Sequence, residues 1–236
     1  IYTLSLHDAL PISHKLYRYR LKITKLGVLK YFSHLDWLNT FLKAVARSGL
    51  NVAYSQGFNP MMKISMGIAL PLFEESECEL IDIELYEDYL PEDIKQKLEK
   101  VLPQGAKIIS IVNLDKSSKA IDVTAQWAEY KISIFDKSLY DFETLMYNTK
   151  EVLSSPEIFI EKKNKKGLLK KTDIKKSIKS YRFDDESLFI VLKTGQSLQE
   201  DSTPALRADV LMNLIAPDVI FNIRRAKFFD TDLHEL

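Results

Sequence analysis

The chain is poor in cysteine, has no long apolar run and carries no net charge. Cys78 is the single cysteine among 236 residues, which excludes an internal disulfide and a cysteine-ligated zinc or iron–sulfur centre within this chain. One thiol is typical of a protein of the reducing cytoplasm, where we expect this chain to be. No apolar run approaches the roughly 18 to 20 residues needed to span a bilayer, so no membrane partner is expected. The 46% hydrophobic and 11% aromatic residues predict a buried core.

The first residues of the sequence look foreign to the rest. Residues 1–13 begin without methionine and resemble translated sequencing-adapter sequence, so we expect a non-native segment there and leave it out of the fold argument. It lacks the basic start and the long apolar stretch of a signal peptide. The missing native start leaves open a fused upstream domain.

Hydrophobic periodicity over residues 14–114 predicts the element order β-α-β-β-α-β. Alternation indicates strands, and three- and four-residue spacing indicates helices. Between 78 and 86 the alternation places Ile81, Ile83 and Leu85 on one face and Asp82 and Glu84 on the other. The expected elements are strands at 17–26, 62–70, 78–86 and 106–114, with helices at 33–48 and from Pro91 to Leu102.

The same order repeats, more loosely, over residues 128–230. A polar connector at 115–127 separates the two repeats, and 231–236 form a tail. The expected strands are 128–135, 157–162, 187–193 and 219–229, and the helices are 138–153 and a second one capped by Thr203 and Pro204 that runs to Leu214. Two ferredoxin-like halves in tandem, an α+β fold, are the simplest architecture with this order.

Ser33, His34 and Asp36 open the first predicted helix. Ser33 as N-cap and Asp36 three residues later form a capping-box pattern, which puts His34 in the first turn. The helix dipole disfavours an imidazolium there, and a neutral imidazole can exchange a proton near neutral pH. His34 is therefore the one candidate catalytic residue. The alternative is that His34 only makes a local hydrogen bond at the helix start. Because no second histidine or cysteine lies nearby in the sequence, we do not expect a metal site at His34.

A rigid turn, Gly57-Phe58-Asn59-Pro60, follows that helix. Glycine allows positive φ and proline restricts both its own backbone and that of the residue before it, so the turn can hold groups in place. Lys63 and Ser65 then share one face of the next strand. An ammonium and a hydroxyl at this spacing suit a phosphate or carboxylate. A structural turn before a half-buried strand explains the same residues.

The neutral total charge hides a strongly basic segment. Residues 162–182 contain ten basic residues and one acid, Asp173. We expect a hairpin there whose positive charges neutralise phosphates, and we expect the arginines of the last strand to extend this basic surface. The alternative is a solvated, lysine-rich loop that prevents pairing with the edge strand of another chain. The candidate nucleic-acid contacts are Lys162, Lys163, Lys165, Lys166, Lys170, Lys171, Lys175, Lys176, Arg224 and Arg225. A second charged run, Glu74, Glu75, Glu77 and Glu79, is expected at the surface, with Mg²⁺ binding as the alternative.

Several motifs together resemble one protein family. They are SHLDWL at 33–38, YSQGFNP at 54–60, KIS at 63–65 and SECEL at 76–80. They resemble the radical SAM-associated domain of unknown function, a bacterial protein encoded beside, or fused to, a cobalamin-binding radical SAM protein. The resemblance covers residues 15–230. Relatives usually have His-Pro after Asn-Pro, where this chain has Met61-Met62.

The resemblance implies an accessory protein rather than the radical enzyme. The partner would carry the iron–sulfur cluster, SAM and possibly cobalamin, and this chain would carry no cofactor, in line with its lack of a three-cysteine motif. Our first hypothesis is a protein that binds RNA or presents substrate to that partner. The alternatives are a metal-independent ribonuclease using His34, as in ferredoxin-like endonucleases, and a protein that only docks its partner.

Overall fold

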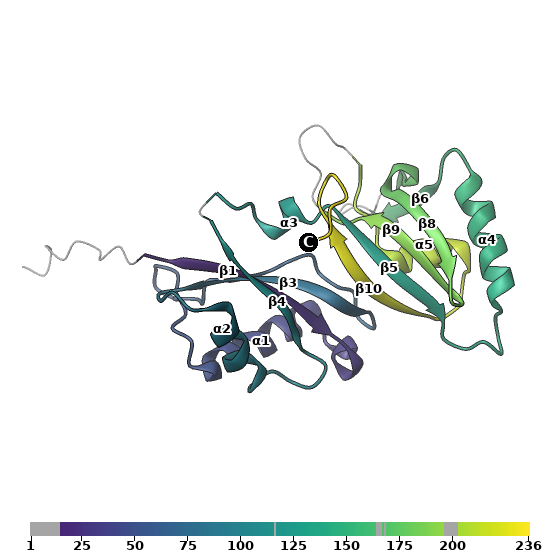
Figure 1. The fold of residues 1–236 in the computed structure, drawn as a ribbon. Coiled ribbons are helices and arrows are strands. Elements are labelled where there is room, and N and C mark those ends of the chain that lie inside the picture. The colour runs from purple at the N-terminus through teal and green to yellow at the C-terminus, as the bar shows by residue number, and fades with distance from the viewer. Residues whose placement is uncertain (1–14, 116, 164–166, 168, 196–202) are drawn as a thin grey trace, which may run out of the picture.

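A computed structural model describes residues 15–115, 117–163, 167, 169–195 and 203–236. The expected adapter segment, 1–13, lies outside them. Eight of the described strands form one mixed sheet, with helices packed against it at both ends (Figure 1). Within these ranges, no helix is long and apolar enough to cross a membrane.

The first half has the predicted β-α-β-β-α-β order. Its central strands pair antiparallel in the order β4-β1-β3, and β2 adds to the other side of β3. This is the strand order of a ferredoxin-like unit. The elements are β1 (Tyr17–Lys25), the 3-10 turn η1 (Gly27–Tyr31), α1 (His34–Ser48), β2 (Ile64–Met66), β3 (Glu75–Leu85), α2 (Pro91–Glu99) and β4 (Ile108–Leu114).

The second half repeats this arrangement with an insertion. Its strands run β10-β5-β9-β8, so that β5, β8, β9 and β10 take the places of the first to fourth strands. The elements are β5 (Trp127–Ile134), α4 (Phe142–Ser154), β8 (Ile178–Asp184), β9 (Ser187–Lys193), α5 (Ala208–Ile215) and β10 (Phe221–Phe229). Inserted between α4 and β8 are β6 (Phe159–Lys163), β7 (Leu169–Asp173) and η2 (Lys175–Ser177). The predicted pair of ferredoxin-like halves is therefore present.

Two details of the second half differ from the sequence-based expectation. The apolar stretch near 157–162 does not enter the main sheet, because β6 pairs only with β7; the second sheet strand is β8 instead. The last helix begins at Ala208 rather than at Pro204, and its N-cap, Arg207, makes no capping hydrogen bond through its side chain. Residues before it run extended, with the Leu206 amide donating to the Lys193 carbonyl.

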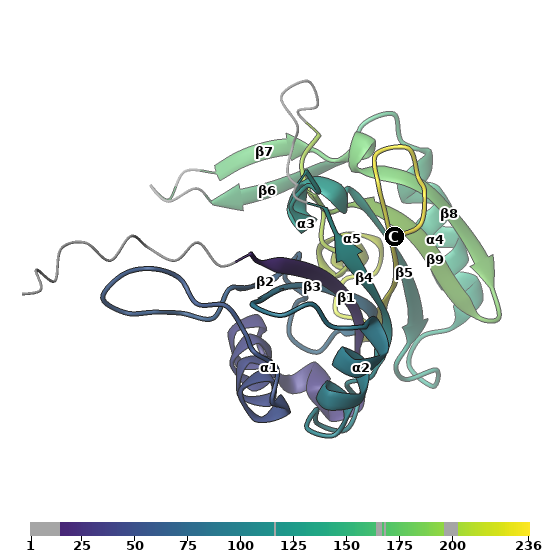
Figure 2. The same cartoon turned by 60° about the vertical axis from the view of Figure 1, so that its left-hand side comes forward.

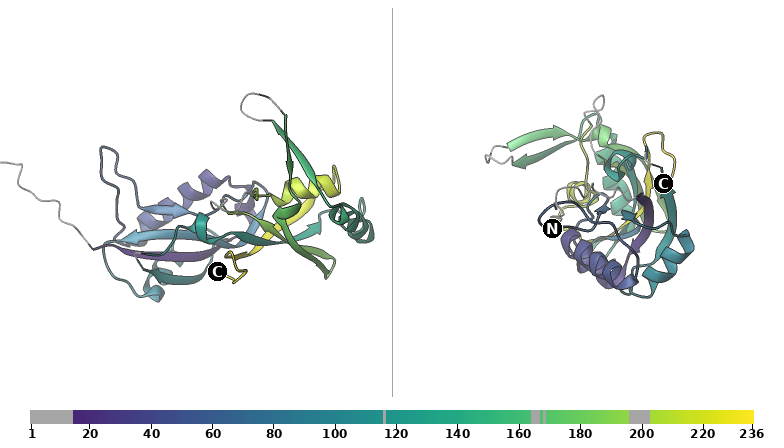
Figure 3. Two further views of the ribbon diagram at one scale, coloured as in Figure 1. Left: turned by 90° about the horizontal axis from the view of Figure 1, so that it is seen from above. Right: turned by 90° about the vertical axis from the view of Figure 1, so that its left-hand side faces the viewer.

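The two halves join through parallel pairing of β3 with β10, where Arg224 lies opposite Glu75 and Arg225 opposite Ser76. Their cores lie on opposite faces of the shared sheet. Successive strand residues point to opposite faces, and on β3 Leu80 belongs to the core of the second half whereas Ile81 belongs to that of the first. Accordingly, α1 and α2 cover one face, and α4 and α5 cover the other (Figures 1 and 3).

The connector and the tail cover the second face of the first half. Arg18 and Arg20 on β1 donate to the carbonyls of Ser118 and Lys119, and both pair with Asp82. The short helix α3 (Ile121–Thr124) then buries Ile121 against Gly67, where a Cβ would lie 2.7 Å from an Ile121 methyl carbon. The tail returns along β10, and the Lys22 ammonium binds its last carbonyl.

Candidate functional site

The start of α1 is a complete capping box. The Ser33 hydroxyl accepts from the Asp36 amide, and the Asp36 carboxylate accepts from the Ser33 amide. Trp37 and Phe41 in the following turns are buried in the core. His34 is half-buried, and its ring has no hydrogen-bond or ion-pair partner among the described residues. Ser33 and Asp36 therefore position the helix, and no described group assists His34 in proton transfer.

Changing Ser33 to Ala should lower the free energy of unfolding by about 1 kcal/mol, because the Asp36 amide loses the hydroxyl that accepts its hydrogen bond. Urea denaturation followed by circular dichroism measures this. His34→Ala is the matched comparison, since its imidazole caps nothing, and should cost less. A larger loss for His34→Ala than for Ser33→Ala would contradict the assignment of the cap.

The Gly57-Phe58-Asn59-Pro60 turn is the tip of a narrow hairpin. Tyr54 bridges to Met62, the Ser55 amide donates to the Met61 carbonyl, and Gly57 adopts φ of +132°. All four turn residues are exposed, and the Phe58 side chain has no cover at all. The hairpin extends away from α1 and β2 (Figure 2). The predicted turn is thus present at the tip of a hairpin, with an exposed aromatic ring at its end.

Lys63 and Ser65 lie at the base of that hairpin, beside a shallow depression of about 470 Å³ that also includes Arg18 and Asp82. The Lys63 ammonium is 3.0 Å from the Glu84 carboxylate. Its charge is therefore already balanced, and an incoming phosphate would compete with Glu84. Lys63 and Ser65 thus share this depression, whereas the four turn residues at the hairpin tip do not line it.

The Ser33, His34 and Asp36 group lies elsewhere. It opens α1, whereas the hairpin follows the end of that helix, and a 15-residue helix is about 21 Å long between its first and last residues. Near the end of α1, Val52 bridges to Leu85 at the far end of β3. The two groups of candidate residues, Ser33 to Asp36 and the turn at 57–60, therefore lie toward different ends of the first half.

The basic segment forms a projecting arm, which we define as β6, β7 and η2. The β6–β7 hairpin stands clear of the main sheet (Figures 2 and 3). Lys170, Lys171 and Lys176 are exposed. Lys175 instead donates to the Leu153 carbonyl, and Lys171 lies 4.1 Å from the centre of the Phe159 ring. The side chains of Lys162 and Lys163, and the whole of Lys165 and Lys166, lie outside the described part.

The single acid of the segment does not neutralise the arm. The Asp173 carboxylate accepts from the amides of Ile158 and Lys175 at the base of the hairpin. These hydrogen bonds are the main cause that lowers the pKa of Asp173, and the charges of Lys176 and Lys175 add to it. The other acid of the arm, Glu161, lies opposite Lys171, and the exposed Lys170 and Lys176 remain available to an anionic partner.

Arg224 and Arg225 do not extend this basic surface. Arg224 pairs with Glu75 and Glu77. Arg225 is 1% exposed and binds Glu79 at 3.0 Å; it also donates to the carbonyls of Ile68 and Ala69. Both residues tie β10 to the first half. The sequence could not reveal this, because the partners come from a strand some 145 residues away.

The four glutamates at the start of β3, expected as a surface cluster, are not all at the surface. Glu74 and Glu79 are buried, and Glu75 and Glu77 are in ion pairs. Five positions separate Glu74 from Glu79, which in a regular strand would put them on opposite faces. A register shift between β1 and β3, opposite Ser76 to Glu79, breaks that alternation. No Mg²⁺ site is assembled from these four side chains.

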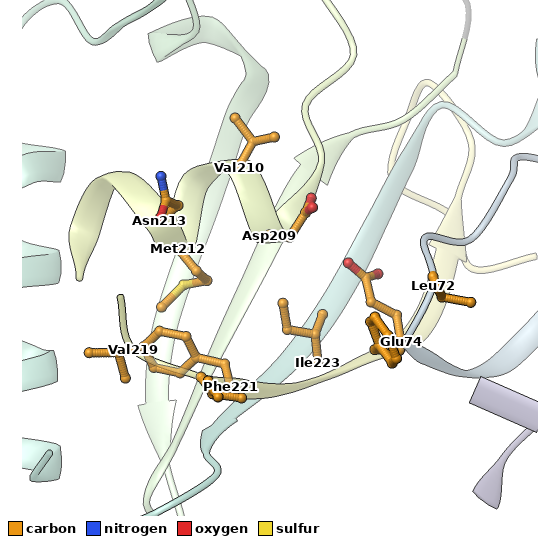
Figure 4. A pocket seen from close by; sticks show the side chains of 11 residues that line it. Leu72, Glu74, Asp209, Val210, Met212, Asn213, Val219, Phe221 and Ile223 are labelled. Atoms are coloured by element: carbon orange, nitrogen blue, oxygen red, sulfur yellow. The ribbon is translucent and has the colours of Figure 1, made fainter. Parts of the chain in front are cut away.

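Glu74 lines a pocket of about 760 Å³ between the β2–β3 connection and the α5 and β10 segments (Figure 4). Figure 4 places its carboxylate on the side of Asp209, with Met212 and Phe221 toward the other end. Both carboxylate oxygens are buried without a hydrogen-bond partner among the described residues. Sequence reasoning missed this site, because its two sides come from different halves.

Burial is the main cause that raises the pKa of Glu74 to about 7. The nearby carboxylates of Asp209 and Glu79 act in the same direction, against the charges of Arg225 and Arg207. Arg207 is bound to Asp209 through two nitrogens, so it does not pair with Glu74. The pocket thus combines apolar walls with one carboxyl group whose charge no described side chain balances.

A cluster of possible metal ligands lies in the tail. Ligand atoms of Asp230, Asp232 and His234 are within 4.8 Å of one another. One Asp230 oxygen already accepts from the amides of Asp232 and His234, and the other lies 3.2 Å from the His234 ring. These contacts account for the turn without an ion.

Comparison with known proteins identifies the family of this chain. The family described as "Uncharacterized protein conserved in bacteria (DUF2344)" matches residues 18–208. The chain belongs to the DUF2344 family. No curated protein matches it. Among solved structures, it is similar to an unknown protein from Galdieria sulphuraria, with 11% identity, 89% of this chain and 99% of that chain covered, and a TM-score of 0.26.

The DUF2344 match includes all the sequence motifs and the basic arm. It runs from β1 to the first residue of α5, and so contains the capping box, the 54–62 hairpin, the arm and Glu74. The other side of the pocket, from Asp209 onward, and the paired arginines of β10 follow the matched range. The family thus covers both candidate surfaces but only one side of the pocket.

Proposed function

We propose that this DUF2344 protein is a cytoplasmic, non-enzymatic accessory protein that binds RNA through its basic arm and presents it to a separate enzyme. By the resemblance of its motifs, that enzyme is a radical SAM protein, which would supply the iron–sulfur cluster, SAM and possibly cobalamin. The observation that supports RNA binding is the projecting arm itself: exposed lysines on a hairpin with two acids, of which Asp173 is engaged in backbone hydrogen bonds and Glu161 lies opposite Lys171.

The physical basis is release of counterions. Each phosphate neutralised by a lysine releases condensed cations, so affinity falls as salt rises, with a slope of about −0.7 per contact on a single strand. A hairpin that stands clear of the body can reach a backbone without a clash with the main sheet (Figure 2). Phe159, 39% exposed beside Lys171, offers a ring on which a base can stack.

The test replaces exposed arm lysines only. A triple variant, Lys170→Ala, Lys171→Ala and Lys176→Ala, should weaken binding of a labelled mixed-sequence single-stranded RNA by at least about tenfold and reduce the salt slope by up to about 2. Fluorescence anisotropy at several salt concentrations measures both. Lys175 is left in place because it holds the Leu153 carbonyl.

The matched control removes the same charge from the first half. Lys43, Lys100 and Lys107 are exposed and lie outside the arm, and their triple alanine variant should keep the affinity and slope of the unchanged protein. Equal losses in the two variants would mean that binding follows total charge rather than the arm. No RNA binding by the unchanged protein would reject the RNA part of the proposal.

The docking alternative rests on the 54–62 hairpin. Phe58 at its tip and Met61 beside it, 68% exposed, form an apolar protrusion suited to a pocket on a partner protein. Co-expression with the adjacent-encoded radical SAM protein would test it. We expect Phe58→Ala to reduce co-purification and the arm variant to leave it unchanged; retention of the partner by Phe58→Ala would remove this hairpin from the interface. No contact of the described residues favours the His34 ribonuclease.

A further inference from the structure

We propose that the pocket between the two halves binds a small organic cation with an apolar body, and that Glu74 is the residue that recognises its nitrogen. The proposal is independent of RNA binding, because the pocket and the arm share no residue. Amines and amidines are the ligand class with the right chemistry.

The walls of the pocket select an apolar body. Met212, Val219, Phe221 and Ile223 contribute hydrophobic side chains from α5 and β10. Its volume of about 760 Å³ lies in the range of small-molecule sites, which are typically about 300 to 1,000 Å³ and mostly apolar with few polar groups. A ligand with one ring or a short alkyl chain would fill part of it.

The polar end of the pocket selects a cation. A buried carboxyl group without a partner is unfavourable, and proteins normally supply an opposite charge or a hydrogen-bond donor. Here the nearby guanidinium groups are bound elsewhere, that of Arg207 to Asp209 and that of Arg225 to Glu79. The 3% exposed Glu74 is left without a donor among the described residues. An ammonium or amidinium group would fill this role, whereas Glu74 and Asp209 together repel a phosphate or carboxylate.

The test compares three probes of the same shape. Phenylbutylamine, phenylbutanol and phenylbutyrate differ only in the cationic, neutral or anionic group at the end of one apolar body. Ligand-detected NMR titrations at about pH 8, where Glu74 is ionised, measure their affinities. We expect the amine to bind at least about tenfold more tightly than the alcohol, and the acid to bind least.

Two variants locate the effect. Glu74→Gln keeps the shape and removes the charge, so it should bring the amine and the alcohol to equal affinity. Asn213→Trp, at an exposed position on the pocket wall, should block both probes without disturbing the core. Glu99→Gln, at an exposed position of α2, should behave as the unchanged protein.

Three results would each overturn the proposal. They are no saturable binding of the amine, equal affinity for amine and alcohol in the unchanged protein, and a preference for the amine that persists in Glu74→Gln.

Discussion

Replacing Arg225 by Met should cost about 3–5 kcal/mol of unfolding free energy. The guanidinium is 1% exposed and contacts the Glu79 carboxylate, the carbonyls of Ile68 and Ala69, and the Tyr130 hydroxyl. Methionine fills the volume and leaves the buried Glu79 charge unpaired, and removal of one member of a buried ion pair typically costs this much. Because Arg225 lies on β10 and Glu79 on β3, the loss falls on the junction of the two halves.

Urea denaturation measures the change, and the adjacent arginine is its control. Arg224→Met removes ion pairs to Glu75 and Glu77 that are partly exposed, 42% for the Arg224 side chain, and should cost no more than about 1 kcal/mol. The double variant Arg225→Met with Glu79→Leu removes both charges and should recover much of the loss. Similar small losses at 224 and 225 would contradict the role assigned to the buried pair.

Glu74→Gln should abolish a large pH dependence of stability. Glu74 has an ordinary pKa of 4.5 when exposed and a pKa of about 7 in the folded chain, mainly because it is buried. Between these values the folded chain holds a proton that the unfolded chain has released. The contribution of Glu74 to the free energy of unfolding is therefore highest below about pH 4.5. It falls as the pH rises toward about 7 and stays low above that pH.

The expected size follows from the shift. A difference of about 2.5 pKa units (7 minus 4.5) corresponds to about 3 kcal/mol. Relative to the unchanged protein, Glu74→Gln should gain about 3 kcal/mol between about pH 4.5 and about pH 8. Urea denaturation across this range measures it, with Glu99→Gln as the exposed control, for which the two profiles should be parallel. A parallel profile for Glu74→Gln would show that Glu74 titrates normally.

The elements with local signals were predictable. The capping box places the start of α1 at His34, Gly49 ends that helix in the left-handed region with φ of 72°, and Pro91 opens α2. Ile81, Ile83 and Leu85 face the core as their alternation indicates. These signals act within a few residues, and the doubled element order that they form was sufficient to predict two ferredoxin-like halves.

Two elements were not predictable from the pattern of their own residues. The apolar residues near 160 predict a strand of the main sheet, but this strand pairs with the lysine-rich β7 and so belongs to the arm. Thr203 and Pro204 predict a helix start. The helix begins later, at Ala208, because the Leu206 amide donates to the Lys193 carbonyl instead. In the first place the partner is the next strand of a hairpin, and in the second it is a carbonyl 13 residues away; neither pairing can be read from the pattern of the element alone.

The amino-acid sequence was enough to establish the fold class, the first helix with its cap, the exposed Gly57 to Pro60 turn and the concentration of positive charge near the arm, because each depends on neighbours in the chain. Only the tertiary structure showed that Arg225 is buried, that His34 is remote from the turn, and that Glu74 lines a pocket where no described side chain pairs with it. The order of charged and hydrophobic residues along a chain does not reveal which residue, distant in the sequence, each of them contacts in the fold. That is decided by the parallel pairing of β3 with β10, which brings residues some 150 positions apart into contact.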